Sequence, residues 1–269
     1  FSRIIPPVIW PPLATQFCLE LACGTLLALA CVHPAPVGRL FYRLLGTTAI
    51  LPLFGELLIR ASGGMAQLWR QPVGLCVLLA VLGYPLLSGG KRPLSRLGAM
   101  VWTFLWSALG LALSLGETAA AESGLGWGLA TLSALSTGAV AGGVGLAMVL
   151  GHWYLTVPNL AVEHLRRLNL VTGLAMVANL LLLGASILVF GDVLEGARTP
   201  LLSPWGMFHL GTRLVVGLIL PLAFALMVRG SLVYGNTRSA TGILYASTVL
   251  VLIGTALALS LQDSYGVPL

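Results

Sequence analysis

The chain has 269 residues, of which 58% are hydrophobic and 8% are charged, and its mean hydropathy is +0.97. Soluble domains carry about a quarter charged residues, so this composition excludes an ordinary soluble protein and indicates a polytopic membrane protein. The net charge of +6 does not indicate nucleic-acid binding, because the basic residues are scattered between apolar stretches, as topology signals are.

The apolar stretches are long enough to serve as transmembrane helices, which need about 20 residues each. Their connections are short, so a soluble domain is not expected. We predict an all-α fold of eight transmembrane helices in a single integral membrane domain over residues 1–269, and eight helices can pack as two four-helix bundles. The predicted segments are 9–32, 40–61, 71–87, 97–115, 125–157, 168–190, 205–229 and 239–261.

The connections differ in charge, and this predicts the orientation. The first, third, fifth and seventh connections hold Arg39, Arg43, Lys91, Arg92, Arg96, Arg166, Arg167, Arg229 and Arg238. The other connections and the two ends hold Arg3, Arg60, Arg70 and Arg198 together with Glu117, Glu122, Asp192, Glu195 and Asp263. Positive charge favours the cytoplasmic side, so both termini are predicted to lie outside. We expect a multi-pass protein of a bacterial inner membrane.

The stretch 205–229 carries two ionisable residues within an apolar run. His209 and Arg213 are four residues apart and therefore share one helical face. An arginine inside a bilayer is costly unless it has a partner or lines a wet cavity. With the predicted orientation, His209 lies near the outer surface and Arg213 lies about 6 Å deeper. This face is the first candidate functional site.

Three further ionisable residues fall in the outer half of the predicted membrane region. Glu56 and Arg60 are four apart in the second segment, and Glu20 lies in the first. Opposite charges that pair inside a membrane avoid much of the cost of separate burial. We hypothesise that these three residues line one site with His209 and Arg213, since histidine and carboxylate groups can accept the protons that a quinol releases. A charge network that only holds the helices together is the alternative, and Arg60 could instead extend toward the membrane surface.

Segment 125–157 combines small residues with an aromatic end. Gly138 and Gly142, like Ala139 and Gly143, are four apart, a spacing that favours close helix packing; room for a bulky cofactor or lipid-like substrate is the alternative. His152 lies in GHWYL at the opposite end of the membrane from His209, which makes the two poor ligands for one haem. His152 is an interfacial anchor or, as the less favoured reading, a haem ligand or proton entry point.

Other sequence signals exclude several classes of site. The four cysteines lie in apolar runs without metal-binding spacing, which indicates buried thiols, so no metal site and no iron–sulfur cluster is predicted. Nucleotide-binding loops and the common hydrolase motifs are missing from the sequence. Pro52 and Pro221 lie within the segments that carry the charged pairs and are expected to bend them.

The sequence FHLGTRLVVGLILPL, followed by SATGILY, resembles membrane anchor subunits of molybdopterin-type respiratory oxidoreductases. The resemblance is to the DmsC and NrfD-like anchors, including polysulfide reductase membrane subunits, and it extends to the overall architecture. It implies a subunit without haem that exchanges electrons between quinone and an iron–sulfur or cytochrome subunit on the outer side.

The expected function is therefore that of a quinone-interacting anchor in a respiratory or photosynthetic electron-transfer complex. If it takes part in catalysis, it does so as the quinone-reactive subunit of an oxidoreductase. His209 or Glu56 would accept the proton, and Glu20, Arg60 and Arg213 would bind the quinone. The expected partners are quinone or quinol, membrane lipid and a redox subunit, with no nucleic acid. The alternatives are a haem b subunit, a purely structural subunit and a small-solute transporter.

Overall fold

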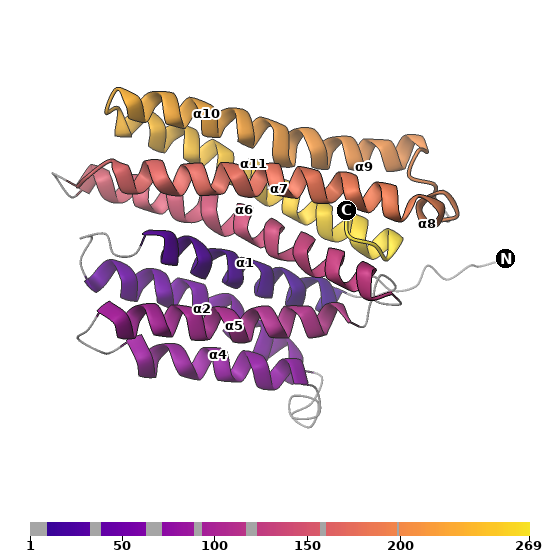
Figure 1. Ribbon diagram of the computed structural model, residues 1–269, viewed down its shortest axis with the longest axis horizontal. Helices are drawn as coiled ribbons and strands as arrows, with labels where there is room; N and C mark the ends of the chain where they lie inside the picture. Colours follow the sequence, from indigo (N-terminus) through magenta and orange to yellow (C-terminus); the bar gives the residue numbers. More distant parts are fainter. Residues whose placement is uncertain are drawn as a thin grey trace.

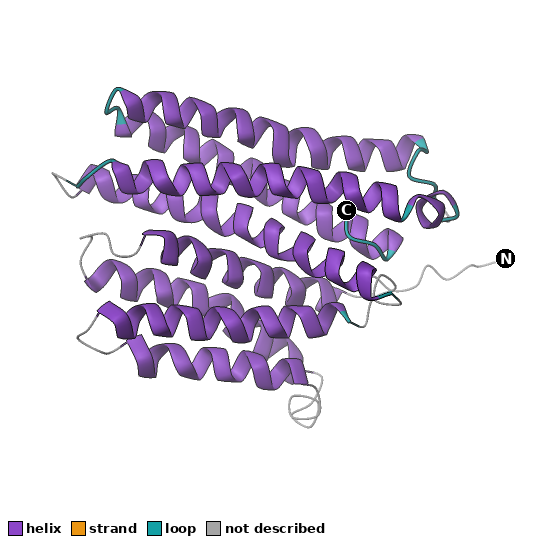
Figure 2. Ribbon diagram, in the orientation of Figure 1, coloured by secondary structure: helices purple, strands orange, loops and turns teal. Residues whose placement is uncertain are grey.

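The structure is a computed structural model that describes residues 10–32, 39–62, 72–88, 93–116, 123–156, 160–197 and 199–269. The described residues are almost entirely helical (Figure 2). The elements are α1 (Trp10–Val32), α2 (Arg39–Ser62), α4 (Pro72–Ser88), α5 (Pro93–Leu115), α6 (Gly124–Thr156), α7 (Glu163–Val189), α8 (Gly191–Glu195), α9 (Pro204–Leu214), the π-helical turn η2 (Val215–Ile219), α10 (Leu220–Val233) and α11 (Thr237–Tyr265).

Seven of these helical segments are long and apolar enough to cross a membrane, with α9, η2 and α10 forming one continuous segment, Pro204–Val233. The apolar part of α4, Pro72–Tyr84, is shorter. Many leucines point away from the interior, and Leu188 keeps 86% of its surface exposed. Soluble proteins rarely expose apolar surface on this scale. The all-α membrane class predicted from composition is therefore supported.

The helices form two groups of neighbours (Figure 1). In the first group, α1 and α5 pack together, α2 packs on α1 and α4, and α4 packs on α5. In the second, α6 packs on α7 and α11, while α10 packs on α7 and α11. The groups meet mainly where α1 packs along α6.

The α1–α6 contact depends on glycine. A methyl group at Gly24 would overlap the backbone carbonyl of Gly138, and one at Gly142 would overlap the backbone of Gly24 and Thr25. Gly138 in turn lies against the backbone of Glu20. Small residues thus let the two helices approach at backbone distance. The prediction of close packing for Gly138 and Gly142 is confirmed.

The regular helix that carries Arg213 is interrupted two residues after it, at Val215. The N–H of Leu220 donates to the carbonyl of Val215, a π-type bond that spans five residues. Pro221 follows, and because proline has no N–H to donate to Gly217, the regular helical pattern cannot continue through this turn. Gly217 meets Gly254 of α11 backbone to backbone. The irregularity expected around Pro221 is therefore present and takes the form of a wider turn.

Candidate functional site

A buried carboxylate lies between α1 and the second group of helices. Glu20 is 2% exposed, and its Oε1 accepts a hydrogen bond of 2.7 Å from Nε2 of Gln16, one turn earlier on α1. Gln16 also pairs with Gln262 of α11 through two amide hydrogen bonds of 2.9 and 3.1 Å. Helices α1 and α11 are thus linked by a pair of amides, one of which holds the carboxylate from one side.

A buried guanidinium lies on the other side of this interior. Arg213 is 2% exposed, and one of its terminal nitrogens donates to Oδ1 of Asn179 over 2.7 Å and to Oγ1 of Thr137 over 3.4 Å. The amide nitrogen of Asn179 donates to the hydroxyls of Ser136, over 2.6 Å, and Thr137, over 2.9 Å. Arg213 is therefore anchored to α6 and α7 by neutral oxygen atoms.

Glu20 and Arg213 interact electrostatically across the interior. Among the described residues, no direct hydrogen bond or ion pair joins them. Each instead keeps one buried polar atom without a hydrogen-bonding partner there, Oε2 of Glu20 and Nε of Arg213. Buried polar groups in proteins nearly always find a partner. Glu20 therefore keeps one acceptor atom, and Arg213 one donor group, without a described partner in the interior.

The main-chain packing fixes the position of this pair. Glu20 lies at the α1–α6 crossing, where its backbone touches Gly138, and Thr137, which contacts Arg213, is the residue before Gly138. The π-helical turn begins two residues after Arg213, and its Gly217 approaches Gly254 of α11. Irregular turns of this kind occur frequently at functional sites. Helices α1, α6, α9 and α11 are thus held close around the two charges.

A groove between α1 and α11 runs beside the amide pair. It has a volume of about 840 Å³, and its walls are mostly apolar, with Ser260, Asp263 and Ser264 near the end of α11. Leu13, Ala14 and Phe17 line it from α1, close in sequence to Gln16. Ligand pockets of membrane-soluble molecules combine such apolar walls with a few polar groups. The groove therefore has the shape and walls for an apolar chain, and its α1 wall is next in sequence to Gln16, which binds the Glu20 carboxylate.

The described contacts of the five predicted site residues fall into three separate sets. Glu20 and Arg213 share one interior, as described above. Glu56 is fully buried and forms an ion pair of 2.7 Å with Arg60, one turn along α2, while its second oxygen has no partner. A methyl group at Gly55, next to Glu56, would meet the sulfur of Cys18 on α1 at 3.8 Å, and no described hydrogen bond or ion pair joins Glu56 to Glu20. His209 belongs to neither pair.

His209 lies at the edge of the bundle. Its Nδ1 is 2.9 Å from the carbonyl oxygen of Trp205, and its ring packs edge-on against Trp205 and Phe208, both of which are exposed. Although His209 is one turn before Arg213, these contacts point its ring away from the interior, along the side of α9 that carries Trp205 and Phe208. The helical spacing placed the two residues on adjacent turns but did not show that only Arg213 points inward.

The remaining candidates contribute no visible cluster. His152 is exposed near the end of α6, at the end of the bundle opposite His209, and His33 lies outside the described residues. The four cysteines are free thiols. Among the described residues, no group of three His, Cys, Asp or Glu side chains is arranged to hold a metal ion.

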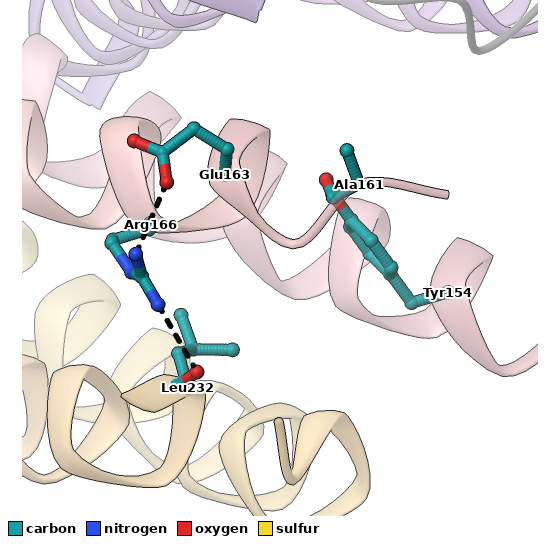
Figure 3. A network of polar contacts seen from close by, with 5 residues as sticks. All are labelled: Tyr154, Ala161, Glu163, Arg166 and Leu232. Carbon is teal, nitrogen blue, oxygen red and sulfur yellow. Dashed lines mark hydrogen bonds and ion pairs between the residues drawn. The ribbon is translucent and has the colours of Figure 1, made fainter. Parts of the chain in front are cut away.

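The opposite end of the bundle carries a second polar network (Figure 3). Arg166, at the start of α7, donates to Oε2 of Glu163 over 3.1 Å and to the carbonyl of Leu232 in α10 over 3.4 Å. The hydroxyl of Tyr154 donates to the carbonyl of Ala161 across the α6–α7 connection. These contacts connect the start of α7 to α10 and to the end of α6.

Sequence reasoning missed four residues of the site. Glu20 is bound by Gln16, which pairs with Gln262, and Arg213 is bound by Asn179 and Thr137. All four of these residues are neutral, whereas the predicted site residues were all ionisable. Amides inside otherwise apolar segments were a usable signal, because each must find a partner within the membrane.

Comparison of the chain with protein-family models, with curated proteins and with solved structures finds no match.

Proposed function

We propose that this protein is a quinone-interacting membrane subunit of an electron-transfer complex. The observation that carries the proposal is that Glu20 and Arg213 are both buried and each keep one unpartnered polar atom. Gln16, which binds the Glu20 carboxylate, is next in sequence to Phe17 in the α1 wall of the α1–α11 groove. A quinol offers hydroxyl groups to a carboxylate, a quinone offers carbonyl oxygens to a guanidinium, and both carry an apolar tail. The resemblance to DmsC and NrfD-like anchors points to the same class.

We assign the proton-accepting role to Glu20 instead of His209 or Glu56. Oxidation of a quinol breaks two O–H bonds and releases two protons and two electrons. Glu20 Oε2 takes one proton, and the second leaves toward the exposed Asp263 at the groove. The electrons pass to an iron–sulfur or cytochrome subunit on the outer side, and Arg213 stabilises negative charge on the reacting oxygen. Quinone reduction is the reverse sequence.

The proposed topology has eight membrane crossings, with α4 as the shortest, and both termini outside. Described basic residues at one end of the bundle support this orientation: Arg43, Arg96, Arg166, Arg167, Arg229 and Arg238. Asp192, Glu195 and Asp263 belong to the other end. Positive charge favours the cytoplasmic side, so the Glu20–Arg213 pair belongs to the outer half of a bacterial inner membrane.

Matched isosteric variants test the proposal. The complex is purified in mild detergent from cells carrying Glu20→Gln or Arg213→Gln, and its bound quinone is extracted and quantified per subunit. Loss of one charged hydrogen bond weakens binding by roughly 10- to 100-fold, so both variants are expected to lose quinone. Glu56→Gln and Arg60→Gln remove the same charges from the separate pair and are expected to retain it. A wild-type complex without quinone, or equal loss in all four variants, would overturn the proposal.

A purely structural subunit is the second candidate. It is favoured by the bonds of Arg213 to Asn179 and Thr137, which tie α9 to α6 and α7 without any ligand. In that case Arg213→Gln would lower thermal stability and the yield of the complex, while the quinone content of the surviving complex would equal that of the wild type.

A further inference from the structure

A second groove lies between α7 and α10, away from the proposed quinone site. It has a volume of about 340 Å³ and is lined on α7 by Gly173, Leu174 and Val177 and on α10 by Leu222 and Leu226. Arg166 and Arg229 line its end nearest the α10–α11 turn. The α7 wall from residue 166 to residue 177 rises about 16 Å at 1.5 Å per residue. The groove therefore joins two cations to an apolar channel that follows the helices.

Arg166 is held in place at the mouth of this groove. Its guanidinium spans from Glu163 to the Leu232 carbonyl, which fixes it across the gap between α7 and α10 (Figure 3). The side chain remains 44% exposed, and a guanidinium has five N–H donors, so donors remain for a ligand. Because Glu163 balances the charge of Arg166, the net positive charge of the groove depends on the second arginine.

Arg229 supplies an uncompensated positive charge. It is exposed, lies one turn from the end of α10, and has no hydrogen bond or ion pair with any residue that the structure describes. Deeper in the groove, a side chain at Gly173 would meet nothing within 4 Å, so the channel is open at that position. A free cation above an open apolar channel matches a molecule with an anionic head and an apolar chain.

We infer that the α7–α10 groove binds an anionic phospholipid, whose phosphate contacts Arg166 and Arg229 and whose acyl chain lies along Gly173, Leu174 and Leu226. Basic pockets between transmembrane helices are known to select anionic headgroups. The apolar length of the groove distinguishes this ligand from free phosphate, which would use only the two arginines. The site serves no step of the proposed quinone chemistry and lies between other helices.

The test measures lipid binding by native mass spectrometry of the purified protein. Phosphatidylglycerol and phosphatidylcholine with identical acyl chains are titrated separately, so that only the headgroup charge differs. Arg229→Gln removes the free cation, and Gly173→Leu fills the channel without changing charge. Arg238→Gln is the matched control, because Arg238 is exposed at the same end of the bundle but does not line the groove.

The wild type is expected to prefer phosphatidylglycerol, and Arg229→Gln to reduce that preference roughly fivefold, the factor for one arginine near a lipid headgroup. Gly173→Leu is expected to weaken binding of both lipids, and Arg238→Gln to change neither. Equal binding of both lipids by the wild type would overturn the inference. Equal effects of Arg229→Gln and Arg238→Gln would also overturn it. A third contradicting result is displacement of the lipid by inorganic phosphate to the same extent in Gly173→Leu as in the wild type.

Discussion

The Glu20–Arg213 pair predicts a non-additive response to neutralisation. Arg213→Gln removes a 2.7 Å hydrogen bond to Asn179 and the positive charge that lies across the interior from Glu20. Glu20→Gln leaves the guanidinium buried at 2% exposure without a counter-charge. Leaving a buried charged group unsatisfied costs about 3 kcal/mol or more, whereas a single hydrogen bond between membrane helices contributes about 0.6 kcal/mol. The lost charge compensation should therefore dominate both single variants.

The double variant Glu20→Gln/Arg213→Gln leaves no unpaired charge. It should be destabilised by less than the sum of the single variants, with a coupling energy of about 2–3 kcal/mol. At roughly 2–4 °C per kcal/mol, each single variant should lower the melting temperature by about 6 °C or more. The double variant should recover a large part of the summed loss.

The chain provides its own reporter for this experiment. Cys23 and Cys76 are buried, and Cys23 lies one turn after Glu20, so a thiol-reactive fluorophore reports exposure of the interior during thermal unfolding in detergent. Glu56→Gln/Arg60→Gln serves as a parallel cycle for the other buried pair. If the Glu20 and Arg213 effects add within about 0.5 kcal/mol, the two charges do not compensate each other and the reasoning is refuted.

Two further predictions concern packing and topology. Gly138→Leu should separate α1 from α6, because the new side chain meets the backbone of Glu20, and should lower the stability by more than about 3 kcal/mol, beyond ordinary overpacking. Gly128→Leu, on the same helix in open space, should change the stability by no more than about 0.5 kcal/mol in the same unfolding assay. In intact cells, a membrane-impermeant maleimide should label Ser123→Cys directly and Ser239→Cys only after permeabilisation, and the reverse pattern would contradict the proposed orientation.

Hydropathy predicted most helix positions closely, because a buried or lipid-facing helix must be apolar along its length. The predicted segment 125–157 corresponds to α6, Gly124–Thr156. The predicted segment 168–190 missed the first turns of α7, which begins at Glu163. Charged residues such as Arg166 end a hydropathy window but do not end a helix, since the helix continues beyond the apolar part of the membrane segment.

The candidate site was less predictable because it depends on how helices rotate against each other. Gln16 and Gln262 are 246 residues apart, and nothing local in the sequence indicates that they pair. His209 and Arg213 share a helical face in projection, yet only Arg213 is buried. The glycines of α1 and α6 can be recognised in the sequence as small residues. That they bring Glu20 beside α6 can be seen only from the way in which the two helices cross.

Quinone binding beside Glu20 and Arg213 is tested most directly by photolabelling. The purified complex is illuminated with a photoreactive quinone analogue, and the labelled peptides are mapped by mass spectrometry with and without excess natural quinone. The account predicts competed labels on the groove residues of α1, around Leu13–Phe17, and of α11, around Leu252–Ser264. Labels confined to the α7–α10 groove, or labels that natural quinone does not displace, would contradict it.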